Sequence, residues 1–120
     1  MNDNYDSILT SVKKLLGLPE EYTAFDPDII MHINTVFFIL NQIGIGPKET
    51  FAIYDSSTTW DEFTSANKTQ IESIKTYVAG RVRLIFDPPT TPALKEAQEK
   101  IVDELEWRLR MEAEFMNDDE

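Results

Sequence analysis

The sequence predicts an all-α fold: a small bundle of about four main helices, with a buried central helix, a long C-terminal helix and a short extended or loop element between the second and third helices. Two observations carry this prediction. Apolar residues recur every three or four positions in four segments, which is the period of an amphipathic helix. Gly or Pro stands at the segment boundaries, where helices begin and end. No alternation of strands with helices appears, so a βαβ fold is not predicted.

The first helix is expected over residues 5–16. Gly17 occupies the position where a left-handed residue ends a helix, and Pro19 follows it. Lys13 and Lys14 lie near the end of the segment, where positive charge suits the helix dipole. Its apolar positions at helical spacing are Tyr5, Ile8, Leu9, Val12, Leu15 and Leu16.

The second helix is expected from Asp26-Pro27 to Ile43, because an acidic N-cap followed by Pro is a strong helix start. Gly44 then ends it. Apolar residues occupy nearly all sides of this segment, with Met31 and Phe38 opposite the main apolar face. A helix of that kind is normally buried all round, so we expect it at the centre of the bundle.

Residues 44–66 change in character, because Gly and Pro interrupt the helical pattern. Phe51–Tyr54 reads equally well as a short strand or as an extended loop. Thr59 and Glu62 have the spacing of a capping box, which predicts a single helical turn over 60–63.

Two further helices complete the expected bundle. The third runs from after Asn67 to Asp87, with Gly80 on the side open to solvent or to a neighbouring chain. The fourth begins at Thr91-Pro92 and reaches about residue 115. We expect one helical domain over 1–116 and a frayed acidic tail over 117–120. The expected apolar faces are Ile71, Ile74, Val78, Val82 and Ile85 in the third helix, and Leu94, Ile101, Leu105 and Leu109 in the fourth.

The composition limits the classes of function. Acidic residues number 22 against 11 Lys and Arg, a net charge of −11. This excess argues against direct binding of DNA or RNA and against docking on anionic membranes. The chain has no Cys, which excludes disulfide scaffolds, thiol catalysis and Cys-ligated metal centres. No secretory signal is visible, and no apolar run approaches the ~20 residues of a membrane helix.

The residues that carry chemistry form no catalytic set, so we expect no enzyme, no cofactor and no metal. His32 is the only histidine and lies beside an apolar helix face, where a packing role is usual. Asp26 and Asp28 have the spacing of calcium ligands, as does the run Asp55-x-Ser57-x-Thr59. The second run lacks the Gly and the Glu that an EF-hand loop requires.

Two features of the predicted surface suggest contacts with other chains. An apolar stripe on the last helix is turned away from its main face, and it is either a wider core face or a partner contact. Basic residues of the third helix form either an ordinary mixed surface or a face for head-to-tail association of copies. The stripe consists of Trp107, Met111 and Phe115, and the basic face of Lys68, Lys75, Arg81 and Arg83.

A succession of local strings resembles the head–tail connector proteins, or neck adaptors, of phages and prophages of Gram-positive bacteria. The resemblance covers most of the chain, and the loop 48–64 and the acidic tail match least well. The strings are Lys13–Gly17, Glu20–Thr23, Phe25–Asn34, Gly44–Pro47, Trp60, Phe86–Pro89 and Glu106–Leu109.

The resemblance implies a helical adaptor without enzymatic activity, located in the virion and in the host cytoplasm during assembly. It implies a ring of copies, typically a dodecamer, that sits under the portal protein, extends the DNA channel and docks stopper or tail-completion proteins. DNA passes through without specific binding, and carboxylates lining the channel would repel its phosphates. On this reading the Trp107/Met111/Phe115 stripe is the candidate portal contact. The candidates for a tail-side or neighbouring-subunit contact are Phe51, Tyr54 and Trp60.

A second class of function stays open at this stage. Small acidic phage proteins can imitate DNA and block a basic host protein, and the net charge of −11 is compatible with that role. Binding by a mimic should weaken as salt rises.

Overall fold

The computed structural model describes residues 6–64 and 68–118. Its helices are α1 (Ile8–Leu15), α2 (Asp26–Ile43), α3 (Trp60–Phe63), α4 (Lys68–Phe86) and α5 (Pro92–Asp118). No strand occurs within these ranges, and the predicted all-α class is confirmed.

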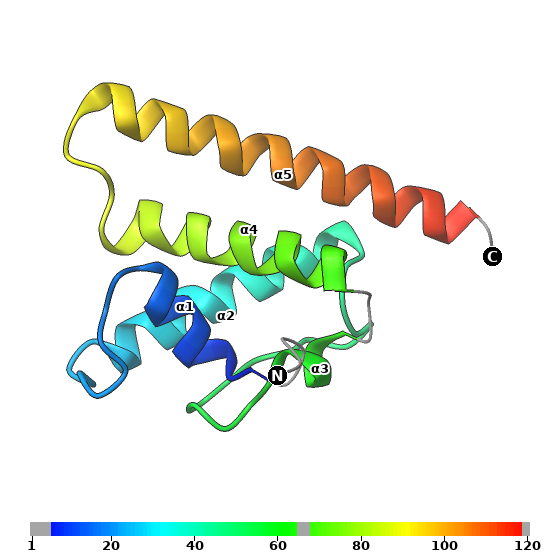
Figure 1. The fold of residues 1–120 in the computed structure, drawn as a ribbon. Helices are drawn as coiled ribbons and strands as arrows, with labels where there is room; N and C mark the ends of the chain where they lie inside the picture. The colour runs from blue at the N-terminus through cyan, green and yellow to red at the C-terminus, as the bar shows by residue number, and fades with distance from the viewer. Residues whose placement is uncertain (1–5, 65–67, 119–120) are drawn as a thin grey trace.

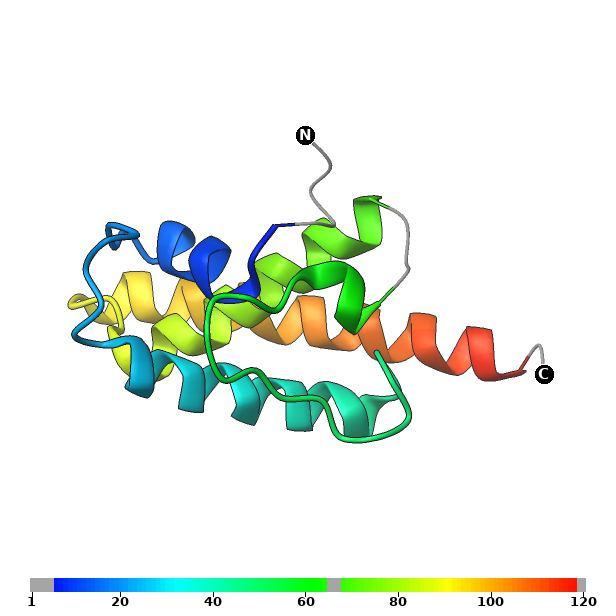
Figure 2. The ribbon, with the colours of Figure 1, turned by 90° about the horizontal axis from the view of Figure 1, so that it is seen from below.

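The central helix of the bundle is α4, because α1, α2 and α5 all pack against it (Figure 1). Helix α5 lies antiparallel to α4, and the view from below shows α1, α2 and the segment joining α2 to α3 on the face away from α5 (Figure 2). The prediction that α2 is buried all round is wrong. Met31 is 57% exposed and Phe38 is 51% exposed, since the bundle has no helix left to cover the outer side of α2.

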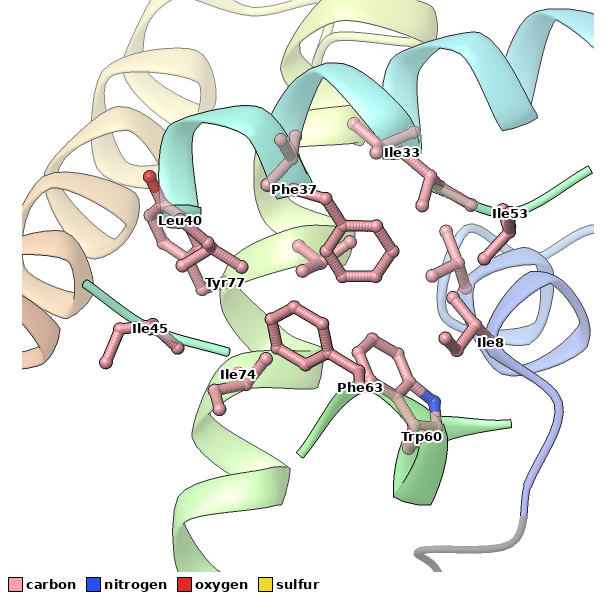
Figure 3. Close-up of a cluster of buried hydrophobic side chains, with 14 of the residues drawn as sticks. Ile8, Ile33, Phe37, Leu40, Ile45, Ile53, Trp60, Phe63, Ile74 and Tyr77 are labelled. Atoms are coloured by element: carbon pink, nitrogen blue, oxygen red, sulfur yellow. The ribbon is translucent and has the colours of Figure 1, made fainter. Parts of the chain in front are cut away.

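Aromatic side chains between α2 and α3 build one end of the core (Figure 3). The rings of Phe37 and Phe63 stack with centroids 4.7 Å apart, and Trp60 meets Phe37 edge-on at 6.1 Å. Trp60 is fully buried, and its indole Nε1 donates a hydrogen bond of 2.8 Å to Ser11 Oγ. This hydrogen bond connects the short helix α3 to α1. It also satisfies the indole N–H, which usually has a hydrogen-bond partner when it is buried.

Helix α1 begins three residues later than predicted, at Ile8. The backbone before it is extended: Ser7 forms a bridge with Thr59, and its side chain caps α1 by accepting a hydrogen bond from Thr10 N. Tyr5, predicted as the first residue of this helix, lies outside the described residues. At the other end Gly17 has φ +82°, the left-handed conformation expected there.

The sequence predicts that Asp26 caps α2, but the side chain of Asp26 does not do so. Asp26 is already helical, and Phe25 stands at the N-cap position without a side-chain hydrogen bond. The Asp26 carboxylate instead lies 2.9 Å from Lys13 Nζ, which also donates to the carbonyls of Glu20 and Tyr22 at 2.9 and 2.7 Å. Lys13 therefore closes the loop between α1 and α2 from inside.

The segment Phe51–Tyr54 is an extended loop and not a strand. Its position is set by one side chain of α2: Asn34 Oδ1 accepts from Ile53 N at 2.8 Å, and Asn34 Nδ2 donates to Ile53 O at 2.9 Å. The capping box at Thr59 and Glu62 and the helical turn that it predicts are confirmed.

Helix α5 continues beyond the predicted end, through Asn117 and Asp118. Its buried face also differs from the predicted one, since Leu94 is 62% exposed and Ile101 is 50% exposed. On α4, Ile85 likewise leaves the predicted core face and is 50% exposed. The residues of α5 that reach the core are Val102, Leu109 and Ala113, with Leu105 partly buried.

Gly80 marks the close approach of α4 and α5. A Cβ atom placed on Gly80 would lie 2.9 Å from Val102 Cγ2 and 3.0 Å from Gln98 Nε2. The side of α4 that the sequence left open to solvent or a neighbouring chain is therefore covered by α5 of the same chain.

Candidate interaction surfaces

The outer face of α5 carries exposed apolar side chains. Trp107 is 57% exposed and Met111 is 41% exposed, so these two residues do not belong to a widened core face. The side chain of Phe115, the third residue of the predicted stripe, lies outside the described part of the structure. In both views the C-terminal end of α5 projects beyond the other helices (Figures 1 and 2). The 27 residues of this helix correspond to about 40 Å of length.

A polar cluster fastens the middle of α5 to α4. Tyr77 Oη donates to Glu106 Oε1 at 2.6 Å, and Arg81 Nη1 donates to the same carboxylate oxygen at 2.8 Å. Burial of the Tyr77 hydroxyl, followed by its hydrogen bond to Glu106, raises the pKa of Tyr77 to about 12. Tyr77 therefore stays protonated and remains a donor at neutral pH. The cluster holds α5 against α4 at Glu106, the residue before Trp107.

Among the described side chains, the predicted basic face of α4 is only partly open to solvent. Lys75 is buried, with its Nζ 5.8 Å from the centre of the Trp60 ring and 3.5 Å from Asp6 Oδ2. Arg81 is engaged by Glu106, and Arg83 is half-buried. The side chain of Lys68 lies outside the described residues. The reason for the difference is that α4, and not α2, is the central helix, so its basic side chains are drawn toward neighbouring elements.

Of the three predicted contacts in the 48–64 loop, only Tyr54 is freely accessible, at 83% exposure. Trp60 is a core residue with 0% exposure and has no surface to offer a partner in this fold. Phe51 is half-buried, and its ring packs edge-on against Phe37 and Phe63 at 5.2 Å from each. Loop composition alone did not separate the core aromatic residues from the exposed one.

Sequence reasoning missed a groove along the outer side of α2. It has a volume of about 530 Å³ and lies between the exposed side chains of Met31 and Phe38. The sequence signal for this groove is the spacing of Met31 and Phe38, which lie seven residues apart on the side opposite the core. The same spacing also predicts a second buried face, and the exposure of both side chains shows that this prediction is wrong. The groove is lined by Pro27, Ile30, Met31, Asn34, Thr35 and Phe38.

A second hollow lies where α1, α4 and α5 meet. Its volume is about 370 Å³, and Leu15, Gly80 and Leu94 are among its lining residues. Arg83 is the one Lys or Arg on its wall.

The described residues hold no group of three or more His, Asp or Glu side chains that could bind a metal ion. His32 is half-buried, with its ring 6.5 Å from that of Phe86. The Asp55 carboxylate accepts hydrogen bonds from the side chain and backbone N–H of Ser57, and these bonds lower the pKa of Asp55. Asp55 thus serves a local turn.

The family model described as "Phage connector protein" matches residues 8–115. The chain belongs to this phage connector family. The match runs from the first residue of α1 into the last turns of α5, so it includes all five helices. No curated protein matches the chain, and no solved structure matches it.

Membership of the connector family gives the protein a structural role in a bacteriophage, as a component of the virion that associates with portal and tail proteins in general. Of the described helices, none is long and apolar enough to cross a membrane.

Proposed function

We propose that this connector is a head–tail adaptor whose copies form a ring, with twelve subunits as in the proteins that it resembles, under the portal. The ring extends the DNA channel and docks stopper or tail-completion proteins. The observation that carries the proposal is the match of residues 8–115 to the phage connector family. A protein of that family connects parts of the virion.

The portal contact is assigned to the outer face of α5. Trp107 and Met111 are large apolar side chains left half in solvent on the helix that projects from the body. Exposed Trp and Met side chains on a rigid helix are typical anchors of protein interfaces. Phe115 extends this stripe by one further turn in the sequence.

The tail-side or neighbouring-subunit contact is assigned to the segment around Tyr54. Its side chain is 83% exposed, while the next residue back, Ile53, is fixed to α2 by Asn34. A rigid backbone that presents an exposed Tyr loses little conformational entropy on binding.

The net charge of −11 per chain suits a DNA channel that must release its cargo. A lumen lined by carboxylates repels phosphate and leaves DNA free to move. The alternative role, imitation of DNA, is supported less well. Three carboxylates of α5 are neutralised by basic residues one turn later, in the pairs Glu96–Lys100, Glu104–Arg108 and Glu106–Arg110.

The proposal is tested by replacing Trp107 and Phe115 with Ala and measuring attachment of the protein to portal-bearing capsids that lack tails. We expect attachment to be abolished while the far-ultraviolet circular dichroism of the isolated protein stays helical. Attachment equal to that of the natural sequence would overturn the assignment of this face.

The matched control replaces Leu94 and Ile101 with Ala. These residues are 62% and 50% exposed on a different flank of the same helix, so the variant removes exposed apolar surface without touching the stripe. We expect it to attach normally. Equal loss of attachment in both variants would show that α5 contributes only general apolar area.

A further inference from the structure

A row of aromatic rings crosses one end of the molecule and is not used by the surfaces described above. The ring centres of Tyr22 and Phe25 are 5.6 Å apart, and those of Phe25 and Phe86 are 5.3 Å apart. His32 completes the row, 6.5 Å from Phe86. These four residues, called here the aromatic end, join the α1–α2 loop, α2 and the last turn of α4.

Two of these rings are open to solvent. Tyr22 is 46% exposed and Phe25 is 40% exposed, whereas Phe86 packs partly against the core beneath them. The loop that carries Tyr22 is held in place, because buried Lys13 donates to the Tyr22 carbonyl at 2.7 Å and pairs with Asp26. The exposed rings are therefore presented on a rigid support, which lowers the entropic cost of binding a partner.

Three carboxylates that lack a counter-ion in the described structure are sequence neighbours of the aromatic end. Glu21 precedes Tyr22, Asp28 lies three residues after Phe25, and Asp87 follows Phe86. All three are exposed, and none pairs with a Lys or Arg of the described chain. Asp26 differs from them because Lys13 neutralises it.

A second copy of this chain does not fit such a surface. Of the four arginines of the chain, Arg81, Arg108 and Arg110 pair with Glu of the same chain. The fourth, Arg83, is half-buried in the wall of the hollow between α1, α4 and α5. With a net charge of −11, two copies repel each other at this end.

We propose that the aromatic end binds an arginine-bearing segment of another protein. A guanidinium can stack on the face of Tyr22 or Phe25 while its N–H fork pairs with an adjacent carboxylate. The ammonium of lysine can pair with a carboxylate, but it cannot at the same time stack as a plane on a ring and form two parallel hydrogen bonds to that carboxylate. Arginine is therefore the preferred residue. This inference concerns a surface separate from the α5 stripe and does not depend on ring formation or on the portal contact.

The test uses acetylated hexa-arginine amide as the probe, with hexa-lysine amide as its comparison, titrated into the full chain by calorimetry at low salt. We expect hexa-arginine to bind more tightly than hexa-lysine. In the variant Glu21→Gln/Asp28→Asn/Asp87→Asn, binding of hexa-arginine should weaken by about tenfold, because the exposed ion pairs with these three carboxylates are lost while the rings stay in place.

The matched control is Glu99→Gln/Asp103→Asn/Glu112→Gln, which removes the same charge from exposed positions of α5. It should weaken binding by less than about twofold, since only long-range attraction is reduced. Equal weakening by the two triple variants would overturn the proposal, because it would show general attraction to an acidic protein.

The stacking contribution is tested separately with Tyr22→Ala/Phe25→Ala. We expect about fivefold weaker binding of hexa-arginine and little change for hexa-lysine. Unchanged hexa-arginine binding would contradict the role of the rings. If the double variant does not fold, Tyr22→Ala alone serves, since its ring is exposed and its carbonyl still accepts from Lys13.

Discussion

Lys13 and Asp26 form an ion pair across the base of the α1–α2 loop, with Nζ and Oδ1 2.9 Å apart and the Lys13 side chain only 3% exposed. The same ammonium donates hydrogen bonds to two loop carbonyls, those of Glu20 and Tyr22. One side chain thus fixes the loop that carries Tyr22 and Phe25, and the first turn of α2.

Replacement of Lys13 by Met should destabilise the fold by about 2–4 kcal/mol, because it leaves a partly buried carboxylate without its counter-ion and two carbonyls without a donor. The measurement is urea unfolding followed by circular dichroism. The exposed neighbour Lys14→Met is the control and should change the free energy of unfolding by less than about 0.5 kcal/mol. Similar losses for both variants would mean that the buried ion pair contributes nothing specific.

Gly80→Ala should separate α4 from α5. The added methyl group would stand 2.9 Å from Val102 Cγ2, and a branched Val side chain cannot move aside easily. We expect a net loss of about 1–2 kcal/mol, overpacking being offset in part by the better helix propensity of Ala. The double variant Gly80→Ala/Val102→Ala should lose less than the sum of the two single variants. Simple additivity in thermal or urea unfolding would contradict the contact.

Tyr77 should make stability fall in alkaline solution. Its folded-state pKa of about 12 lies above the ordinary value of 10.0, so its stabilising contribution is complete below pH 10 and is lost as the pH rises toward 12. Ultraviolet difference titration should show one tyrosine ionising at the higher value. Tyr77→Phe should remove both that step and the associated loss of stability, and a variant that retains the step would show that another tyrosine is responsible.

Asn34→Leu should loosen the segment between α2 and α3. It removes the paired hydrogen bonds to Ile53 N and Ile53 O, and each unsatisfied group costs about 1–3 kcal/mol. We expect lower stability to urea and faster proteolysis within residues 48–58. The control Thr35→Ala changes an exposed neighbour and should leave both unaffected. Unaltered proteolysis in Asn34→Leu would contradict the anchoring role.

Helix boundaries were predictable where local chemistry decides them. Gly44 ends α2 with φ +103°, Thr59 and Glu62 form their capping box, and Thr91 Oγ1 accepts a hydrogen bond from Leu94 N at the start of α5. Each signal depends on residues within one turn, so no knowledge of the tertiary structure is needed. The exception is Asp26, which a distant lysine removes from its expected capping role.

The buried faces were harder to predict, because helical periodicity does not say how many neighbours a helix has. Met31 and Phe38 on α2, and Leu94 and Ile101 on α5, have the spacing of core residues but face solvent. The fates of Trp60 and Lys75 likewise depend on contacts distant in the sequence, with Ser11 and Asp6. The sequence is sufficient to name candidate surface residues. The structure is needed to show which of these candidates, such as Trp60 and Lys75, are buried in the core.

Electron cryo-microscopy of phage particles that carry this protein tests the connector assignment most directly. The account predicts helical density for repeated copies of this chain between the portal and the tail, with the end of α5 and Trp107 turned toward the portal. Particles that lack the chain at the neck, or that contain it only as a single copy elsewhere, would contradict it.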